Sequence, residues 1–486
     1  MRVRLAKADR LKAAGIEPYP VGYPRTHTIA QVRERHGDLP ADTATGDVAG
    51  VAGRVLLYRT GGKLCFASIK DGTGEIQVMV ARDKVGEDAL AAWKSDVDIG
   101  DHVGVTGEII TSRSGELSVL ANSFAITSKS LRPLPDKHAG LTDPQSRVRM
   151  RYVDLIVNPE ARRLAELRAA VTRAIREELH SQGYVEAETP MLQTLHGGAN
   201  ARPFSTHINA YDMQLYLRIA LELYLKRLMV GGLEKVYELG RNFRNEGADA
   251  THNPEFTMLE AYWAYADYDK IANMVEEMIC HLAEQVAGGL QVEHRDAEGN
   301  VTRTLNLTQP WRRARYRDLV REVAGADWFE LSSEQRRERA RSLAVEMGPH
   351  LADFEVTQHV FEKLVEEKTF DPLFVTHCPK ELVPLAKQNV DEPDLVDVYE
   401  LIINGVEISP GYTELNDPVV QRQRLLAQAG EETQKIDEDF LLALEHGMPP
   451  AGGFGLGIDR LTMLLTGAES IRDVILFPLL KPRRVT

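Results

Sequence analysis

KVYELGRNFRNEGADATHNPEFTMLEAYWAY, residues 235–265, predicts a long β-hairpin, because two strand-like runs flank a polar loop. Alternation along the second run divides its side chains between two faces. Phe256, Met258, Glu260 and Tyr262 fall on one face, and Thr257, Leu259, Ala261 and Trp263 fall on the other. A strand face that carries an aromatic ring, a carboxylate and a phenol is unusual for packing alone, so it indicates a binding surface. A salt-bridged surface hairpin is the alternative.

The loop of this hairpin gathers polar side chains that suit a nucleotide. They are Arg244, Glu246, His252 and Asn253. An arginine fits an α-phosphate because its planar guanidinium donates two parallel hydrogen bonds. The ring of Phe256 is suited to stack on a flat base. The hairpin and its loop therefore predict a nucleotide site.

A glycine-rich strand and helix, GGFGLGIDRLTMLLTG at residues 452–467, give a second signal. Gly453, Gly455 and Gly457 alternate, so one face of the strand would carry no side chains. This favours the close approach of a flat ligand or of another backbone. Arg460 lies at the start of the following helix, a position suited to polyphosphate. Tight packing of the helix on the strand is the alternative explanation.

A third cluster is YELIINGVEISPGYTELND, residues 399–417. Glu400 and Glu407 bracket a strand–turn–strand pattern around Asn404-Gly405. Two carboxylates that converge across such a turn suit Mg²⁺, which prefers one or two carboxylates together with phosphate oxygens. Solvated glutamates on an edge hairpin are the alternative.

The organisation of the chain changes along its length. Short alternating runs separated by Gly-rich turns predict a small antiparallel barrel, for which an OB-type barrel is the best match. Later residues mix long helices with strands, which predicts an α+β fold with an antiparallel sheet flanked by helices. We expect four parts: an N-terminal helical and extended segment at 1–45, the barrel at 46–130, a linker at 131–150, and the α+β domain at 151–486.

Composition and missing motifs exclude several classes of protein. With 58 Lys and Arg against 72 Asp and Glu, the formal net charge is −14, so nucleic acid could be held only by local basic patches. Cys65, Cys280 and Cys378 lie far apart, which excludes a disulfide framework or a thiolate zinc site. The charged N-terminus and the lack of a long apolar run predict a cytoplasmic protein with no membrane partner. A GxxxxGK[ST] loop and an HExxH helix are absent.

Together these segments resemble the class II aminoacyl-tRNA synthetases, and specifically the lysyl-tRNA synthetases. The helix that ends at Gly183, with YVEAETP after it, resembles motif 1; FRNEG…HNPEFTMLEAY resembles motif 2; and GLGIDR…IRDVILFP resembles motif 3. The resemblance continues through LRPLPDK, GGANARPF and LYLKRLMVGG and into the barrel at GKLCF and GELSV. The opening MRVRLAKADRLKAAGIEPYP also resembles the synthetase half of bacterial fusion proteins that make lysylphosphatidylglycerol.

The resemblance implies a role for each matching residue. Arg244 would hold the α-phosphate and the amino-acid carboxylate, and Arg460 the γ-phosphate, so both would be catalytic. The resemblance implies ATP contacts at Glu246, His252, Asn253, Phe256, Glu400 and Gly457, and lysine contacts at Gly198, Glu222, Glu260, Tyr262, Tyr412 and Glu414. It also implies Mg²⁺ ligands at Glu400 and Glu407, and anticodon contacts at Arg54, Phe66 and Gln77.

The activity that the resemblance implies is that of a lysine–tRNA ligase. Such an enzyme activates lysine with ATP and Mg²⁺ to lysyl-adenylate, transfers it to the 3′ end of tRNA(Lys), and forms a homodimer through motif 1. The residues agree, because a pocket of Glu222, Glu260 and Glu414 is acidic and suits a dication such as lysine.

Two positions depart from the family. Pro410 stands where the family has an Asn that helps to hold the substrate carboxylate, and Leu221 stands where the family has a Pro beside Glu222. Losing a hydrogen bond to a charged group costs about 1.5–3 kcal/mol. Two alternatives therefore stay open: a paralogue that adenylates another amino acid or serves another acceptor, and a non-catalytic nucleic-acid-binding regulator.

Overall fold

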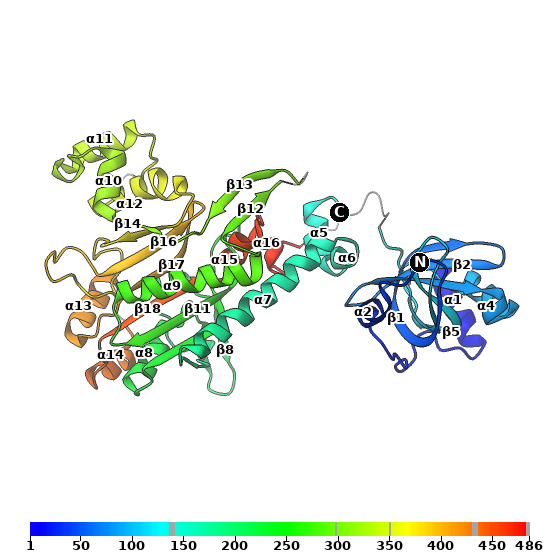
Figure 1. The fold of residues 1–486 in the computed structure, drawn as a ribbon. Coiled ribbons are helices and arrows are strands. Elements are labelled where there is room, and N and C mark those ends of the chain that lie inside the picture. The colour runs from blue at the N-terminus through cyan, green and yellow to red at the C-terminus, as the bar shows by residue number, and fades with distance from the viewer. Residues whose placement is uncertain (136–140, 297–298, 349–350, 430–435, 483–486) are drawn as a thin grey trace. The chain divides into compact units, whose positions relative to one another are not determined.

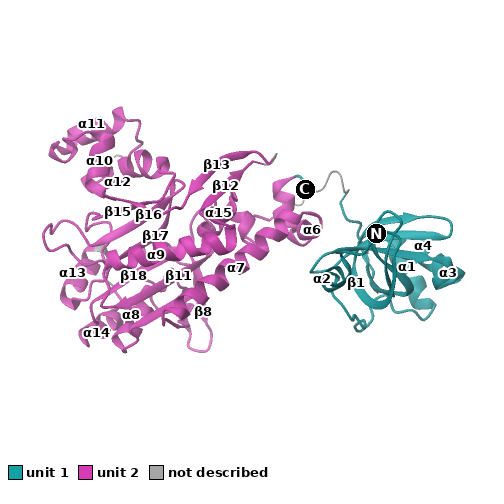
Figure 2. Cartoon of the chain, in the orientation of Figure 1, with its two compact units in different colours: residues 1–142 teal, residues 143–486 magenta. Residues whose placement is uncertain are grey.

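The computed structural model describes residues 1–135, 141–296, 299–348, 351–429 and 436–482. The chain forms two compact units, residues 1–142 and residues 143–486 (Figure 2). Helix α5 (Pro144–Arg149) belongs to the second unit, although it lies inside the range that we predicted as linker. Residues 136–140 of that range lie outside the described residues. The finer division into four parts stays a prediction.

The first unit is built around a closed barrel with the strand order β1-β2-β3-β5-β4 (Figure 1). Val51, Val55, Ile69 and Val78 alternate with outward-facing residues and are fully buried. The predicted barrel is confirmed, except that β3 and β5 pair parallel and not antiparallel. The helices between β3 and β4 were not predicted. The elements are α1 (Arg2–Ala13), α2 (Ile29–His36), β1 (Ala44–Thr60), β2 (Leu64–Lys70), β3 (Glu75–Ala81), α3 (Arg82–Val85), α4 (Glu87–Asp96), β4 (His102–Thr111) and β5 (Leu117–Ser128).

The second unit is built on a sheet with the strand order β14-β15-β16-β17-β18-β11-β10-β6. The inner strands pair antiparallel, as predicted, whereas the edge pairs β14–β15 and β10–β6 are parallel. The strands are β14 (Arg312–Arg315), β15 (Leu373–Thr376), β16 (Val398–Ile403), β17 (Val406–Thr413), β18 (Ala451–Gly457), β11 (Glu255–Ala264), β10 (Lys235–Phe243) and β6 (Val185–Glu186). The predicted hairpin of residues 235–265 is therefore the pair β10–β11.

Helices cover one face of this sheet and flank the other. Helices α7 (Pro159–Ser181), α9 (Tyr268–Leu282) and α15 (Ile458–Thr466) pack on the face of Leu259 and Ala261, and α7 and α9 run along the sheet in Figure 1. Helices α8 (Glu222–Val230) and α14 (Glu438–Glu445) pack together with Tyr262 on the opposite face. The face of the sheet that carries Glu260 and Tyr262 is therefore bordered by α8.

Local signals explain where the motif 1 helix begins and why the next strand is short. The side chain of Asn158 accepts a hydrogen bond from Glu160 N, Pro159 occupies the first turn, and Gly183 follows with φ of +82°. The predicted strand YVEAETP pairs only at Val185–Glu186. Its continuation is lost because the N–H of Thr189 donates to the side chain of Glu238 instead of to a strand.

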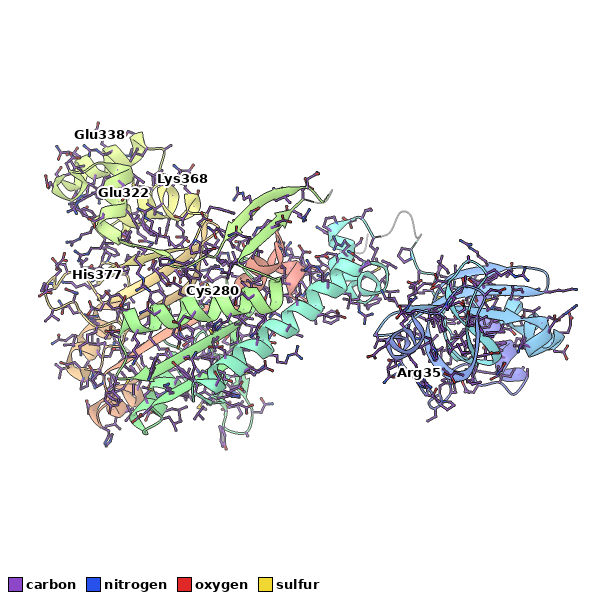
Figure 3. All side chains as sticks on the ribbon, in the orientation of Figure 1. Arg35, Cys280, Glu322, Glu338, Lys368 and His377 are labelled. Carbon is purple, nitrogen blue, oxygen red and sulfur yellow. The ribbon has the colours of Figure 1, made fainter. Side chains whose placement is uncertain are left out.

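The remaining elements lie around these layers. Helices α10 to α12 form a separate helical layer, whose outer surface carries the exposed Glu322 and Glu338 (Figure 3). None of the helices in the described ranges combines the length and the apolar character that crossing a membrane requires. The helices and strands of the second unit whose bounds have not yet been given are α6 (Arg151–Val157), β7 (Leu192–Gln193), β8 (Ser205–Ile208), β9 (Met213–Leu217), η1 (Ala283–Ala287), β12 (Gln291–Arg295), β13 (Val301–Asn306), α10 (Tyr316–Ala324), η2 (Trp328–Glu330), α11 (Ser333–Ser342), α12 (Asp353–Leu364), η3 (Glu366–Lys368), α13 (Pro418–Ala429) and α16 (Ile471–Val474).

Candidate active site

The glycine strand β18 leaves room over the polar face of β11. Glu260 pairs with Gly455 and Tyr262 pairs with Gly453 across the two strands. A Cβ atom at Gly453 would collide with Glu414 Oε1 and the Tyr262 ring, and one at Gly455 would lie 2.9 Å from Met258 Cε. The absence of side chains on this face of β18 therefore gives space to Glu414, Tyr262 and Met258, which confirms the strand predicted from the alternating glycines.

A cavity of about 440 Å³ lies at the loop end of the hairpin. Of the residues predicted to contact ATP, the cavity is lined by Arg244, Glu246, His252, Asn253, Phe256, Gly457 and Arg460. Glu400 does not line it, but Glu407 does. Residues from the hairpin, from β17 and from α15, far apart in the sequence, thus meet at one cavity.

Arg244 is held over Phe256 in this cavity. Its guanidinium carbon lies 5.1 Å from the centre of the Phe256 ring, and its Nε has no hydrogen-bond partner among the described residues. Burial lowers the pKa of Arg244 and Arg460 adds to this, whereas Glu260, Glu246 and Glu407 oppose it. A guanidinium with unused donors beside a second arginine is suited to an anionic ligand.

Arg460 is oriented by a chain of hydrogen bonds. Its Nη1 donates to Glu407 O at 2.7 Å, and its Nη2 donates to His252 Nε2 at 3.1 Å. Because a guanidinium only donates, His252 Nε2 must accept, so Nδ1 carries the hydrogen and donates to Asp249 at 2.9 Å. Burial opposes ionisation of Asp249, but hydrogen bonds from Thr251 and His252 outweigh it and lower its pKa to about 2.

Three buried carboxylates continue this face beyond the cavity. Glu260 accepts hydrogen bonds from Leu221 N–H at 3.0 Å and from Tyr262 Oη at 3.1 Å. Glu222 accepts one from Tyr412 Oη at 2.9 Å. Burial raises the pKa of Glu260 to about 7 and that of Glu414 to about 8. The structure thus brings together the predicted residues Glu222, Glu260 and Glu414.

Lys226, which the sequence analysis did not single out, lies among these carboxylates. Its side chain is fully buried, and its Nζ lies 2.5 Å from Glu222 Oε1 and 2.5 Å from Glu414 Oε2. Burial would lower the pKa of Lys226, but Glu222 and Glu414 outweigh it and raise the pKa. The available signal was the four-residue spacing from Glu222 in ELYLKRL, which places both side chains on one face of a helix.

Gly198 lies beside Glu222, as predicted. Its φ of +85° is unfavourable for other residues, and a Cβ there would lie 3.4 Å from the Glu222 Cβ and 3.0 Å from the Ala220 Cβ. The backbone at Gly198 therefore approaches the start of α8 closely.

Glu400 and Glu407 lie on the hairpin β16–β17, whose turn residues Asn404 and Gly405 both have positive φ, as a two-residue I′ turn requires. Burial raises the pKa of Glu400 to about 8, and the carboxylates of Glu407 and Glu366 add to the rise. The described residues contain no group of three or more His, Cys, Asp and Glu placed to hold a metal ion. Two mutually repelling carboxylates nevertheless fit Mg²⁺ when phosphate oxygens complete its ligands.

The two departures from the family have different structural consequences. Leu221 donates its backbone N–H to Glu260, a hydrogen bond that a proline could not make. Pro410, on β17, lines the same cavity as Arg244 and has no N–H. Pairing between β17 and β18 covers Gly411–Thr413, and before it the Ser409 hydroxyl donates to Gly455 O at 2.6 Å.

In the first unit, a cleft on the outside of the barrel contains two of the three predicted anticodon residues. Phe66 and Gln77 line it together with Arg59, whereas Arg54 does not line it and donates to Gly100 O at 2.8 Å. A bulge in β1 between Val55 and Leu57 places Arg59, not Tyr58, opposite Phe66. Arg59 was not singled out from the sequence, and the bulge that places it opposite Phe66 depends on the pairing of β1 with β2.

Known families and proteins match both units. The model of the class II tRNA synthetases (D, K and N) matches residues 143–481, and that of the OB-fold nucleic acid binding domain matches residues 50–127. A lysine–tRNA ligase of Mycobacterium bovis is 49% identical over 99% of this chain and 97% of its own length. Those of Carboxydothermus hydrogenoformans and Kineococcus radiotolerans are 47% and 48% identical over 99% of this chain, and over 98% and 97% of their own lengths.

The matches agree with the geometry. A glycine strand faces a polar strand, two arginines line one cavity, and three carboxylates lie beyond it. The chain therefore belongs to the class II tRNA synthetases (D, K and N), in the family of the lysine–tRNA ligases.

Proposed function

We propose that this chain is a lysine–tRNA ligase that activates lysine with ATP and transfers it to the 3′ end of tRNA(Lys). The observation that carries the proposal is the group of three buried carboxylates, Glu222, Glu260 and Glu414, on the face that continues from the arginine-lined cavity. A neutral amino acid would leave these carboxylates unpaired, and an acidic one would be repelled. Two ammonium groups on one small amino acid fit them.

In the first step, the lysine carboxylate attacks the α-phosphorus of ATP, the bond to the β-phosphate oxygen breaks, and pyrophosphate leaves. We assign Arg244 to the α-phosphate and the lysine carboxylate, and Arg460, oriented through His252 and Asp249, to the γ-phosphate. Phe256 supplies a stacking face for adenine. Positioning and neutralisation of charge by these groups supply the acceleration.

In the second step, a hydroxyl of the terminal ribose of tRNA attacks the lysyl carbonyl, and AMP leaves. We propose no side-chain nucleophile, since the adenylate is already an activated anhydride. The carboxylates of Glu222, Glu260 and Glu414 hold the two ammonium groups through both steps. The acyl carbon of lysine therefore stays in place while its bond to AMP is replaced by a bond to the ribose oxygen of tRNA.

We propose that Glu400 and Glu407 hold Mg²⁺. The support is their mutual repulsion in a partly buried position and their oxygen-only chemistry. Bound there, the ion would neutralise charge on the phosphates of ATP.

We propose that residues 46–130 bind the anticodon through Phe66, Gln77 and Arg54, and that Arg59 joins them. The cleft lined by Phe66, Gln77 and Arg59 supports this, because an aromatic face and a guanidinium can stack on and hydrogen-bond to unstacked bases. The segment 1–45, the linker 131–150 and the catalytic domain 151–486 complete the proposed division.

We propose that the enzyme is a homodimer formed through motif 1 and works in the cytoplasm. Exposed apolar side chains at Val185, Met191 and Leu192, on and just after the short strand β6, support the dimer, because an edge strand with apolar neighbours is a common interface. Three buried thiols, Cys65, Cys280 and Cys378, are consistent with a reducing compartment.

The experiment that tests the function is amino-acid-dependent ATP–pyrophosphate exchange with the purified protein. We expect lysine to support exchange and the other amino acids to support it far less. Higher efficiency with another amino acid would move the proposal to a paralogue. No exchange with any amino acid would favour a non-catalytic regulator.

A further inference from the structure

The ammonium of Lys226 occupies a special place among the carboxylates of the pocket. It bridges Glu222, on its own helix α8, and Glu414, which directly follows β17, with both ion pairs at 2.5 Å. It also lies 5.7 Å from the centre of the Tyr412 ring, and Tyr412 donates to the second oxygen of Glu222. Lys226 thus joins two of the three carboxylates that we propose to hold the ammonium groups of the substrate.

This arrangement leaves one carboxylate oxygen of the pocket conspicuously unused. Both oxygens of Glu222 and both of Glu260 are paired. Neither buried oxygen of Glu414 has a hydrogen-bond partner among the described residues; Oε2 is held by the ion pair with Lys226, while Oε1 lies over the empty Gly453 face. An unpaired buried carboxylate oxygen is costly, so this atom is prepared for a donor from outside the protein.

The charges of the pocket can be counted. With all groups ionised, Glu222, Glu260 and Glu414 contribute −3 and Lys226 contributes +1, which leaves −2. The substrate lysine brings two ammonium groups to this pocket, while its carboxylate is assigned to Arg244. With Lys226 present, the two ammonium groups of the substrate bring the net charge of the pocket to zero. Without Lys226, one buried negative charge would remain unpaired.

We propose that Lys226 is a specificity-determining positioning residue: its ammonium holds the carboxylates of Glu222 and Glu414 in place and sets the pocket charge that a substrate with two ammonium groups neutralises. This inference rests on the proposed function, since it assigns a role within the lysine pocket. The simpler role, an ion pair that only fastens α8 to the sheet, predicts a loss of stability without a change in substrate preference.

The test compares Lys226→Met with Arg227→Met in ATP–pyrophosphate exchange between pH 6 and 9. Arg227 is the matched control, because it lies next on α8 and also makes a partly buried ion pair, at 2.7 Å with Asp437, away from the pocket. The pH profile also depends on the other titratable and charged groups that face Lys226 and its partners. They are Glu222 on α8, Glu260 and Tyr262 on β11, Tyr412 at the end of β17, Glu414 directly after it, and Arg244.

For Lys226→Met we expect a KM for lysine that is about tenfold to a hundredfold higher at pH 7 and that falls as the pH rises, because the carboxylates then need a higher pH to ionise. We also expect preference for lysine over norleucine, its neutral analogue, to fall at least about tenfold. Arg227→Met should change neither the pH profile nor this preference. Lys226→Arg, which retains the charge, should retain the wild-type pH profile.

The outcomes separate the two proposals. If the wild type shows lysine-dependent exchange and Lys226→Met behaves like Arg227→Met, Lys226 is only a structural ion pair and the inference is wrong. If the wild type shows no exchange with lysine, the proposed function itself fails. If Lys226→Met does not fold, Lys226→Gln takes its place, because it removes the charge but keeps a hydrogen-bond donor. We expect its KM for lysine to fall as the pH rises, as for Lys226→Met.

Discussion

Two groups of glutamates lie around the same sheet and differ in which charged groups of the protein surround them. Glu222, Glu260 and Glu414 are almost fully buried and enclose a cation of the protein's own, Lys226. Glu400 and Glu407 are only partly buried, and the groups that act most on Glu400 are Glu407 and Glu366, both acidic. The first group is balanced for two added ammonium groups. In the second, Arg460 and Arg244 act on Glu407, while the charged groups that act most on Glu400 among the described residues are acidic.

The difference indicates two kinds of ligand. A pocket whose carboxylates are held by fixed donors and by Lys226 discriminates between substrates by their shape and by the number of positive charges they bring. A pair of repelling carboxylates at a cavity edge binds a small hard cation with less geometric demand. The following experiments, from the largest expected effect to the smallest, test this division.

Glu414→Gln should give the largest effect. The change removes the charge that pairs with Lys226 and the free oxygen prepared for the substrate, so Lys226 is left with one buried partner. Truncating one partner of a buried charge pair costs about 2–5 kcal/mol, so kcat/KM for lysine should fall by a factor of about 30 or more. Steady-state exchange at varied lysine concentration measures kcat/KM, and a decrease of less than tenfold would contradict the assignment of Glu414 to the substrate.

Glu400→Gln should affect only the group formed by Glu400 and Glu407. We expect the Mg²⁺ concentration for half-maximal exchange to rise about tenfold or more, with little change in KM for lysine at saturating Mg²⁺. A Mg²⁺ titration at fixed ATP measures the shift. A changed lysine KM with an unchanged Mg²⁺ requirement would reverse the roles that we give to the two clusters.

The stability of the ligand-free protein should fall as the pH rises. The pKa is about 7 for Glu260 and Glu366 and about 8 for Glu400 and Glu414, all above the ordinary value for glutamate. Between the ordinary value and these values the folded protein binds more protons than the unfolded chain, so the free energy of unfolding decreases with pH through that window. Thermal unfolding from pH 5 to 9 measures it, and lysine and Mg²⁺ should each restore part of the loss. Unchanged stability would show that these groups are not protonated when folded.

Leu221→Pro should have a smaller effect. It removes the N–H that donates to Glu260 at 3.0 Å. Because the pKa of Glu260 is about 7, this carboxyl group is only partly ionised at neutral pH, so the bond is worth about 1.5 kcal/mol and KM for lysine should rise roughly tenfold. Leu221→Met keeps this N–H and serves as the control. Equal KM values for the two variants would mean that Glu260 does not depend on this donor.

Pro410→Asn should have the smallest effect, in the opposite direction. An asparagine on this part of the cavity wall would offer a side-chain donor to the substrate carboxylate, so KM for lysine should fall a few-fold. Lysine titration in the exchange assay measures it. An unchanged KM would show that another group already compensates for the proline.

The local sequence pattern predicted the elements whose structure is set by residues close to them in the sequence. Period-two alternation gave the hairpin β10–β11, and Asn158-Pro159 gave the start of α7, because both are set within a few residues. The hairpin loop and the glycine-rich segment already pointed to Arg244, His252, Phe256 and Arg460, the family resemblance assigned them roles, and the structure brings them together.

The features that the sequence did not reveal depend on distant contacts. Lys226 resembles any charged residue of a surface helix until Glu414, nearly two hundred residues later, is placed beside it. Arg59 was missed because the bulge in β1 depends on its pairing with β2. Leu221 appeared as a weakness in the sequence, whereas its N–H proves to be a donor to Glu260. Long-range pairing, rather than local propensity, decides these three.

Proton release on lysine binding tests the central claim most directly. If the buried carboxylates of Glu260 and Glu414 receive the substrate's ammonium groups, their raised pKa values must drop on binding, and protons must leave at pH 7. Calorimetric titration of lysine in buffers of different ionisation enthalpy measures this number. We predict net release at pH 7 that diminishes towards pH 9; binding without release at pH 7 would contradict the account.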